Sequence, residues 1–297
     1  MKLTERFAKG EFVLTSEVGP MKGCIKNGEE PSFLKEAKSI AQRVHAINVT
    51  DNQSAVMKLG SLAASLRLKN EGIEPIFQMT CRDRNRIALQ SDLLSACSLG
   101  IENVLCLTGD HIKLGDHRSA KPVFDIDSVQ LVAIARKLNQ GYDMAGNELT
   151  SPTSLAVGAV VNPGFEPLDL QLIKMEKKVA AGAEFFQTQA IYDVSIFEKF
   201  MEKARQFGVP IQYGTVVIKS PEMARYMNEH VAGIRVPESI IEELASVPKE
   251  RRKEKAVEIS ARLVGDVAPM VQGIHFMPLG WSDLVPDILE RARIHAA

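Results

Sequence analysis

The sequence predicts an α/β fold, a single (β/α)8 or TIM barrel over residues 1–297. Eight apolar segments alternate with helical segments, and no linker-like change of composition divides the chain. The apolar segments are continuously apolar rather than alternating, which is typical of parallel strands buried on both faces. The main alternative, a doubly wound open sheet, would be expected to carry a glycine-rich first turn, and Glu17-Val18-Gly19-Pro20 is not a G-x-G-x-x-G motif.

The first half of the chain contains four predicted strands. The helix after the first strand has the clearest pattern, because its apolar residues fall on one face and Ser32 precedes Glu36 in the manner of an N-cap. Gly72 is expected to end the second helix. The predicted strands are residues 12–17, 44–49, 75–80 and 104–107, and the predicted helices are residues 32–42, 54–69 and 84–98.

The second half of the chain begins with a long polar loop over residues 111–124. Loops of this length in compact domains are usually functional or disordered. The helical segment before the last strand is predicted as two pieces split near Pro248, so extra helices precede the eighth strand. The predicted strands are residues 155–161, 184–189, 211–218 and 273–277, and the predicted helices are residues 128–138, 168–181, 194–207, 221–230, 237–264 and 281–295.

The composition argues against several classes of function. A net charge of −1, one Trp and four Tyr argue against a nucleic-acid partner. The chain shows no apolar signal segment and no membrane-spanning segment, which predicts a cytoplasmic protein without membrane insertion. The four cysteines lack metal-ligand spacing, so no metal is expected, although His111, Asp116 and His117 form an alternative ligand set in one loop. Cys81 is expected to be a packing residue, with a reactive thiol as the alternative.

Polar side chains follow the apolar strands. Val104 to Leu107 is an apolar run that stops at Thr108-Gly109, and Asp110 follows it. Thr-Gly-Asp is also compatible with an ordinary turn in which Asp110 caps a helix. In a barrel, however, the carboxyl ends of all strands share one mouth. The polar residues expected there are Glu17, Thr50, Asp51, Gln78, Thr80, Thr108, Asp110, Asn162, Gln187, Gln189, Thr215, Lys219, His275 and Trp281.

A mouth lined by amides, hydroxyls and carboxylates suits a planar polar heterocycle. The order and spacing of several short motifs then resemble the methylenetetrahydrofolate reductase family, and in particular the short reductases of acetogenic and corrinoid-linked pathways. The resemblance covers nearly the whole chain. Its motifs are Ser16-Glu17 with Gly19-Pro20, Asn48-Val49-Thr50, Met79-Thr80-Cys81-Arg82-Asp83, Leu107-Thr108-Gly109-Asp110, Lys177-Lys178-Val179-Ala180-Ala181-Gly182-Ala183, and Gln187-Thr188-Gln189 with Tyr192-Asp193.

The resemblance implies a flavin at the barrel mouth and the reduction of 5,10-methylenetetrahydrofolate to 5-methyltetrahydrofolate. Glu17 matches the general acid that protonates N10 of the folate, and a buried carboxyl group favours the protonated form that this role requires. Asp110 matches the aspartate beside the flavin. The matched flavin-binding positions are Thr50, Asp51, Gln78, Thr80, Thr108, Gly109, Asp110, Asp125 and Lys178, and the matched substrate-binding positions are Glu17, Asp110, Gln189 and Trp281.

The chain departs from better-known family members at three of these positions. Gln78 stands where they carry a histidine, Thr108 where they carry an arginine before Gly-Asp, and Trp281 where they carry an arginine after the last strand. These departures leave FAD and FMN both open as the flavin, and NADH, NADPH and ferredoxin as the electron donor. A homo-oligomer or a complex with a partner subunit is expected. Two alternative functions are a folate-binding barrel of the methyltransferase type and a non-catalytic flavin or folate subunit.

Overall fold

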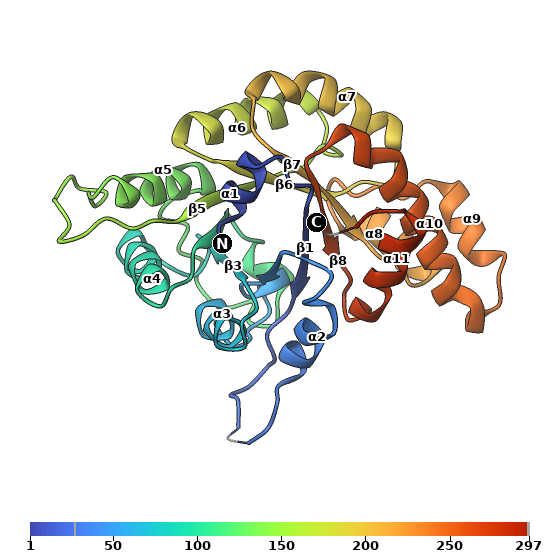
Figure 1. The fold of residues 1–297 in the computed structure, drawn as a ribbon, viewed down its shortest axis with the longest axis horizontal. Coiled ribbons are helices and arrows are strands. Elements are labelled where there is room, and N and C mark those ends of the chain that lie inside the picture. The colour runs from blue at the N-terminus through green and yellow to red at the C-terminus, as the bar shows by residue number, and fades with distance from the viewer. Residues whose placement is uncertain (27, 296–297) are drawn as a thin grey trace.

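Eight parallel strands close into a barrel in the order β1 to β8, and helices surround it (Figure 1). The computed structural model describes residues 1–26 and 28–295, so residues 27, 296 and 297 of the predicted barrel lie outside the described part. The predicted (β/α)8 fold is confirmed. The strands are β1 Val13–Val18, β2 Ala46–Val49, β3 Pro75–Thr80, β4 Asn103–Leu107, β5 Ala156–Val161, β6 Phe185–Ala190, β7 Ile211–Val216 and β8 Gly273–Met277.

The predicted extra helices before the last strand are also confirmed. Three helices, α8 to α10, lie between β7 and β8, and the chain between α9 and α10 passes through Pro248 as expected. The helices are α1 Leu3–Ala8, α2 Ser32–Ile40, α3 Ser61–Asn70, α4 Arg86–Ser98, α5 Ser128–Asn139, α6 Leu168–Ala181, α7 Val194–Ala204, α8 Pro221–His230, α9 Glu238–Ala245, α10 Arg252–Val267 and α11 Val285–Arg291.

Two helix predictions were wrong in their extent. The helix predicted over residues 54–69 begins only at Ser61, because Asn52, Ser54 and Ala55 adopt positive φ angles of 45°, 56° and 58° that an α-helix does not contain. The closing helix, predicted over residues 281–295, is confined to α11 and preceded by a short 3-10 turn. Helix α1 was not predicted.

The amino end of the barrel interior is filled by apolar side chains. Leu3 of α1 joins this cluster, which explains why the N-terminal helix packs under the barrel. The Phe185 ring is fully buried there, and Gly158 on the neighbouring strand leaves the space that the ring occupies. The cluster consists of Leu3, Val13, Ala46, Ile76, Leu105, Ala156 and Phe185.

Gly158→Ala is expected to lower the free energy of unfolding by about 1–3 kcal/mol, because overpacking a tight core is destabilising. A Cβ at this position would lie 2.3 Å from the ring of Phe185. Urea unfolding measures the change. Gly265→Ala in α10 is the control: its Cβ would meet no atom within 4 Å, so it is expected to stabilise the protein by up to about 1 kcal/mol. Equal effects of the two substitutions would contradict this account of the core.

A polar layer lies above the apolar cluster. The Gln187 side chain donates to Thr15 Oγ1 at 3.3 Å and accepts from Asn48 Nδ2 at 2.8 Å. Gln212 Nε2 donates to Thr15 Oγ1 at 3.1 Å. His275 Nδ1 lies 3.0 Å from the same hydroxyl. Residues two positions apart on a strand face the same way, so this layer supports the side chains at the carboxyl end of the barrel.

Candidate active site

Glu17 lies at the carboxyl end of β1, on the same inward face as Thr15. Glu17 is only 7% exposed, and its Oε2 lies 3.8 Å from His275 Nε2. His275 is itself held by Thr15 through its other ring nitrogen. The Glu17 carboxyl group thus lies at the mouth beside a histidine whose ring is held by a buried hydrogen bond.

Thr50, directly after β2, and Gln78, on β3, are both buried. Thr50 is only 2% exposed, and its hydroxyl has no hydrogen-bond partner among the described residues. Its side chain points inward like Asn48, two residues earlier on β2. A buried hydroxyl without a partner is costly, so a polar ligand at the mouth would satisfy it.

Asp51 and Thr80 bind each other. The Thr80 backbone N–H and hydroxyl both donate to Asp51 Oδ2 at 2.9 Å. Arg84 also pairs with this carboxylate, and it reaches Asp92 of α4 at 2.9 Å. The carboxylate of Asp51 thus joins the ends of β2 and β3 through contacts within the chain.

The end of β4 approaches its neighbours closely. Gly109 has a φ of +89°, and a Cβ there would lie 3.0 Å from Thr80 Cβ and 3.2 Å from Arg82 Cβ, so only glycine fits. Thr108 Oγ1 donates to Ser128 Oγ at 3.0 Å, at the start of α5. Asp110 is exposed and accepts from the backbone N–H of Ser54 at 3.2 Å.

The alternative interpretation of Asp110 as a helix cap is wrong. Helix α5 is capped by Asp127, whose side chain accepts from Gln130, and the 3-10 turn after Asp110 is capped by His111. The Asp110 carboxylate instead joins the loops after β2 and β4.

Arg82 is a site residue that sequence reasoning did not select, although it lies in one of the matched motifs. It is 1% exposed, and its guanidinium binds Asp83 through two hydrogen bonds of 2.9 and 2.8 Å. It also donates to the backbone oxygens of Asn52 at 3.1 Å and Asp110 at 3.3 Å. Arg82 therefore connects the loops that follow β2, β3 and β4.

The other predicted site residues lie farther around the mouth or away from it. Asp125 forms a bidentate pair with Arg86, which lowers the pKa of its carboxyl group to about 2. The Gln189 side chain accepts from the backbone of Ala190 at 3.0 Å. Two ammonium groups lie close to the Trp281 ring, with Lys219 Nζ 5.1 Å and Lys253 Nζ 5.3 Å from its centroid.

The loop residues considered as metal ligands are engaged otherwise. Asp116 accepts from Lys22 at 2.5 Å and from the Met57 backbone at 3.1 Å, and His117 lies against it. Across the described part of the chain, no cluster of three His, Cys, Asp or Glu residues has the geometry to hold a metal ion. Burial raises the pKa of the Cys81 thiol to about 12, which agrees with a packing role.

Lys178 is 93% shielded from solvent on α6, and its ammonium group donates to the Val160 carbonyl at 2.7 Å. Burial lowers its pKa to about 8. The carbonyl belongs to β5, near the mouth. This cation is thus buried beside the carboxyl end of the barrel, with a backbone oxygen as its hydrogen-bond partner.

The stability of the flavin-free protein is expected to depend on Lys178 above neutral pH. The unfolded chain holds this proton up to about pH 10.5 and the folded chain only to about pH 8, so the free energy of unfolding rises with pH between these values. Relative to Lys178→Met, the wild type should gain about 2 kcal/mol between pH 7 and 9.5 in urea unfolding. Lys177→Met, at an exposed position, is the control and should show no such gain. A pH-independent difference for Lys178→Met would contradict the prediction.

Over residues 1–26 and 28–295, no helix has the length and apolar character needed to cross a lipid bilayer.

The model of the methylenetetrahydrofolate reductase family matches residues 2–293. The chain is 24% identical over 280 residues to the probable methylenetetrahydrofolate reductase (NADPH) of Caenorhabditis elegans. This match covers 88% of the chain and 39% of the C. elegans protein. It is 27% identical over 229 residues to the probable methylenetetrahydrofolate reductase (NADH) of Oryza sativa subsp. japonica, covering 74% of this chain and 37% of that protein. The chain thus spans less than half the length of these relatives.

Solved structures share the barrel fold. An uncharacterised protein from Clostridium thermocellum, which binds two copies of 5-methyl-5,6,7,8-tetrahydrofolic acid, superposes with a TM-score of 0.64 at 15% identity, covering 98% of this chain and 97% of that one. The EDTA monooxygenase EmoA from Chelativorans sp. BNC1 gives a TM-score of 0.54 at 9% identity, covering 96% and 98%. At these identities the likeness shows the fold alone. Because the family model covers nearly all of the sequence, the chain belongs to the methylenetetrahydrofolate reductase family.

Proposed function

We propose that this chain is a flavin-dependent reductase that converts 5,10-methylenetetrahydrofolate to 5-methyltetrahydrofolate. The observation that carries the proposal is Glu17, a buried carboxyl group at the mouth of a barrel that belongs to this family. The five-membered ring that joins N5 and N10 of the folate must open before its carbon can accept a hydride. Opening requires a proton at N10, and Glu17 is the group proposed to deliver it.

The residues at the mouth fit a flavin. The Thr50 hydroxyl is buried and has no partner within the described chain, and Gln78 on the neighbouring strand offers an amide. Thr108, Gly109 and Asp110 complete this side of the mouth, and Lys178 supplies a cation beyond it. When bound, the flavin supplies the hydride. FAD is the first candidate and FMN the alternative.

Asp110 is proposed to act through its charge. Ring opening gives the folate a cationic 5-iminium group, and a nearby carboxylate stabilises positive charge, most strongly where water is excluded. The hydrogen bond from the Ser54 backbone and the contact of Arg82 with the Asp110 carbonyl hold this residue in place. Asp110 thus favours the open, reactive form of the substrate.

Gln189 and Trp281 are proposed to contact the folate, and Asp51, Thr80 and Asp125 to shape the flavin side of the mouth through their own pairs. The names of two relatives specify NADPH and NADH, so a nicotinamide donor is proposed, with ferredoxin as the alternative. The whole protein is proposed to act as a homo-oligomer or with a partner subunit.

Two measurements test this function. The purified protein should hold about one flavin per chain, identified as FAD or FMN by mass spectrometry. Its yellow colour should bleach with dithionite and return with menadione, and it should form 5-methyltetrahydrofolate with NADH, NADPH or reduced ferredoxin. A colourless protein that transfers a methyl group to a corrinoid would favour the methyltransferase alternative. Flavin binding without turnover under any donor would favour the non-catalytic subunit.

A further inference from the structure

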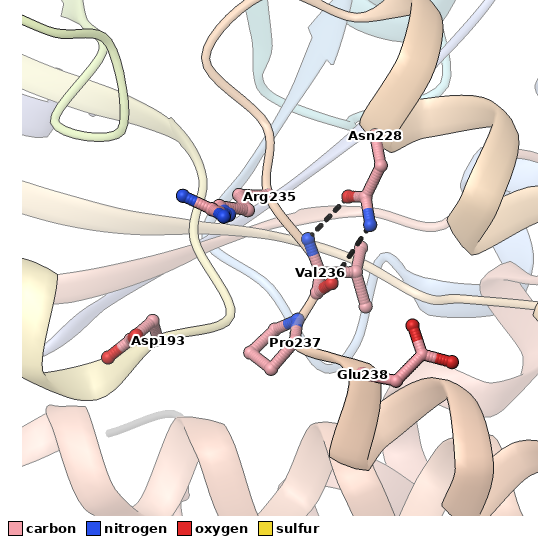
Figure 2. A pocket seen from close by; sticks show the side chains of 6 residues that line it. All are labelled: Asp193, Asn228, Arg235, Val236, Pro237 and Glu238. Carbon is pink, nitrogen blue, oxygen red and sulfur yellow. Dashed lines mark hydrogen bonds between the residues drawn. The ribbon is translucent and has the colours of Figure 1, made fainter.

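A cavity of about 350 Å³ lies beside the carboxyl end of β6, outside the site described above (Figure 2). It is formed where the start of α7 meets the loop between α8 and α9. The residues that line it are Asp193, Asn228, Arg235, Val236, Pro237 and Glu238.

The loop that carries Arg235 is held firmly. Asn228 Oδ1 accepts from the Val236 backbone N–H at 2.7 Å, and Asn228 Nδ2 donates to the Val236 carbonyl at 3.0 Å, as Figure 2 shows. The side chains of Ile234 and Val236, on either side of Arg235, are buried in the same apolar cluster. Arg235 is thus an exposed cation on a fixed backbone, which lowers the entropic cost of binding a ligand.

Arg235 is the one charged side chain in the lining of the cavity that no described residue holds. Asp193 caps α7 and accepts from the Ser195 backbone at 2.9 Å and hydroxyl at 2.7 Å. Glu238 lies 3.7 Å from Arg225. The Arg235 guanidinium, in contrast, makes no hydrogen bond or ion pair with any described residue. The Arg235 guanidinium is therefore free to bind an anion, and its fork of N–H donors suits a carboxylate.

The cavity borders the barrel mouth on the side of β5 to β7. Asn162, directly after β5, donates to the Ala232 carbonyl at 3.2 Å and so ties the Arg235 loop to the rim. Asp193 lies four residues after Gln189 of β6. The proposed flavin residues Thr50, Gln78 and Thr108 belong instead to the ends of β2 to β4.

We propose that Arg235 binds a carboxylate of the glutamyl tail of the folate, an inference that rests on the proposed function. A folate is elongated, with its pterin at one end and its glutamyl carboxylates at the other. With the pterin over the flavin on the β2–β4 side, the tail leaves the mouth past Gln189 and meets the rim at the Arg235 cavity.

The test uses the flavin-loaded full chain and Arg235→Ala. For triglutamyl 5,10-methylenetetrahydrofolate, KM should rise about tenfold with kcat unchanged, because one charge-assisted hydrogen bond is lost. Calorimetry with p-aminobenzoyl-triglutamate, which lacks the pterin, should show a similar loss of affinity. Arg205→Ala is the matched control, since it removes an exposed arginine beyond the opposite end of α7.

Unchanged folate KM and unchanged binding of the fragment in Arg235→Ala would overturn the inference while leaving the proposed function intact. A rise in the KM of NADH or NADPH alone would assign the site to a donor phosphate and also overturn it. If the wild type reduces no folate, the proposed function fails, and the calorimetric comparison still reports on the Arg235 site.

Discussion

Glu17→Gln should lower the turnover number for 5,10-methylenetetrahydrofolate by about 10²-fold or more, the usual contribution of a general acid. Glutamine has nearly the same shape and keeps the polar contact with the His275 side of the mouth, but it has no acidic proton to give to N10. Glu17 is buried next to the Thr15 and His275 pair, and it is the one carboxyl group on β1. No other side chain of this strand could therefore supply the proton. The loss should appear in kcat rather than in flavin content.

Glu11→Gln is the control for this measurement. Glu11 precedes the same strand, but it lies at the amino end of the barrel and pairs with Arg6 at 2.5 Å. Its substitution should leave turnover unchanged. The rate of product formation under saturating donor distinguishes the two variants. A Glu17→Gln protein that retains flavin and turns over like the wild type would refute the role of Glu17 as the acid.

The strand ends could be predicted because a parallel barrel follows from local patterns. Continuous apolar runs mark its strands, and the first polar residue after each run marks the mouth. The alternation along a strand also explains why Glu17, two residues beyond Thr15, faces inward.

The contacts between the loops could not be predicted, because they depend on backbone conformations and partners that are distant in the sequence. Asn52, Ser54 and Ala55 adopt left-handed backbone conformations, but none of them is a glycine, the residue that would have indicated such a turn. Residues 54–60 were therefore assigned to a helix. The same turn presents the Ser54 N–H to Asp110, a contact across 56 residues of sequence. Arg82 appears from sequence alone as an ordinary charged loop residue, and only its burial shows that it links three loops.

Arg82→Gln should lower the free energy of unfolding by about 3 kcal/mol, because it removes a guanidinium that is 1% exposed and leaves its hydrogen-bond acceptors without this donor. The substitution removes two hydrogen bonds to Asp83 and those to the carbonyls of Asn52 and Asp110. Urea unfolding of the flavin-free protein measures the loss. The dissociation constant of the flavin, measured by fluorescence, should also rise, since the loops after β2 and β4 then keep only the hydrogen bond between Ser54 and Asp110.

Arg86 is a matched control, because its guanidinium also donates two hydrogen bonds to one carboxylate, that of Asp125, at 2.8 and 3.0 Å. The Arg86 side chain, however, is half-exposed. Arg86→Gln should cost clearly less than Arg82→Gln, because the Arg86 guanidinium is 47% exposed and water already competes for its pair with Asp125. The double variant Arg82→Gln with Asp83→Asn should recover little of the loss, since the Asp83 carboxylate is 31% exposed and water solvates it once Arg82 is gone. Equal losses in Arg82→Gln and Arg86→Gln would mean that burial adds nothing to the first pair. The loops around Asp110 would then need another explanation for their positions.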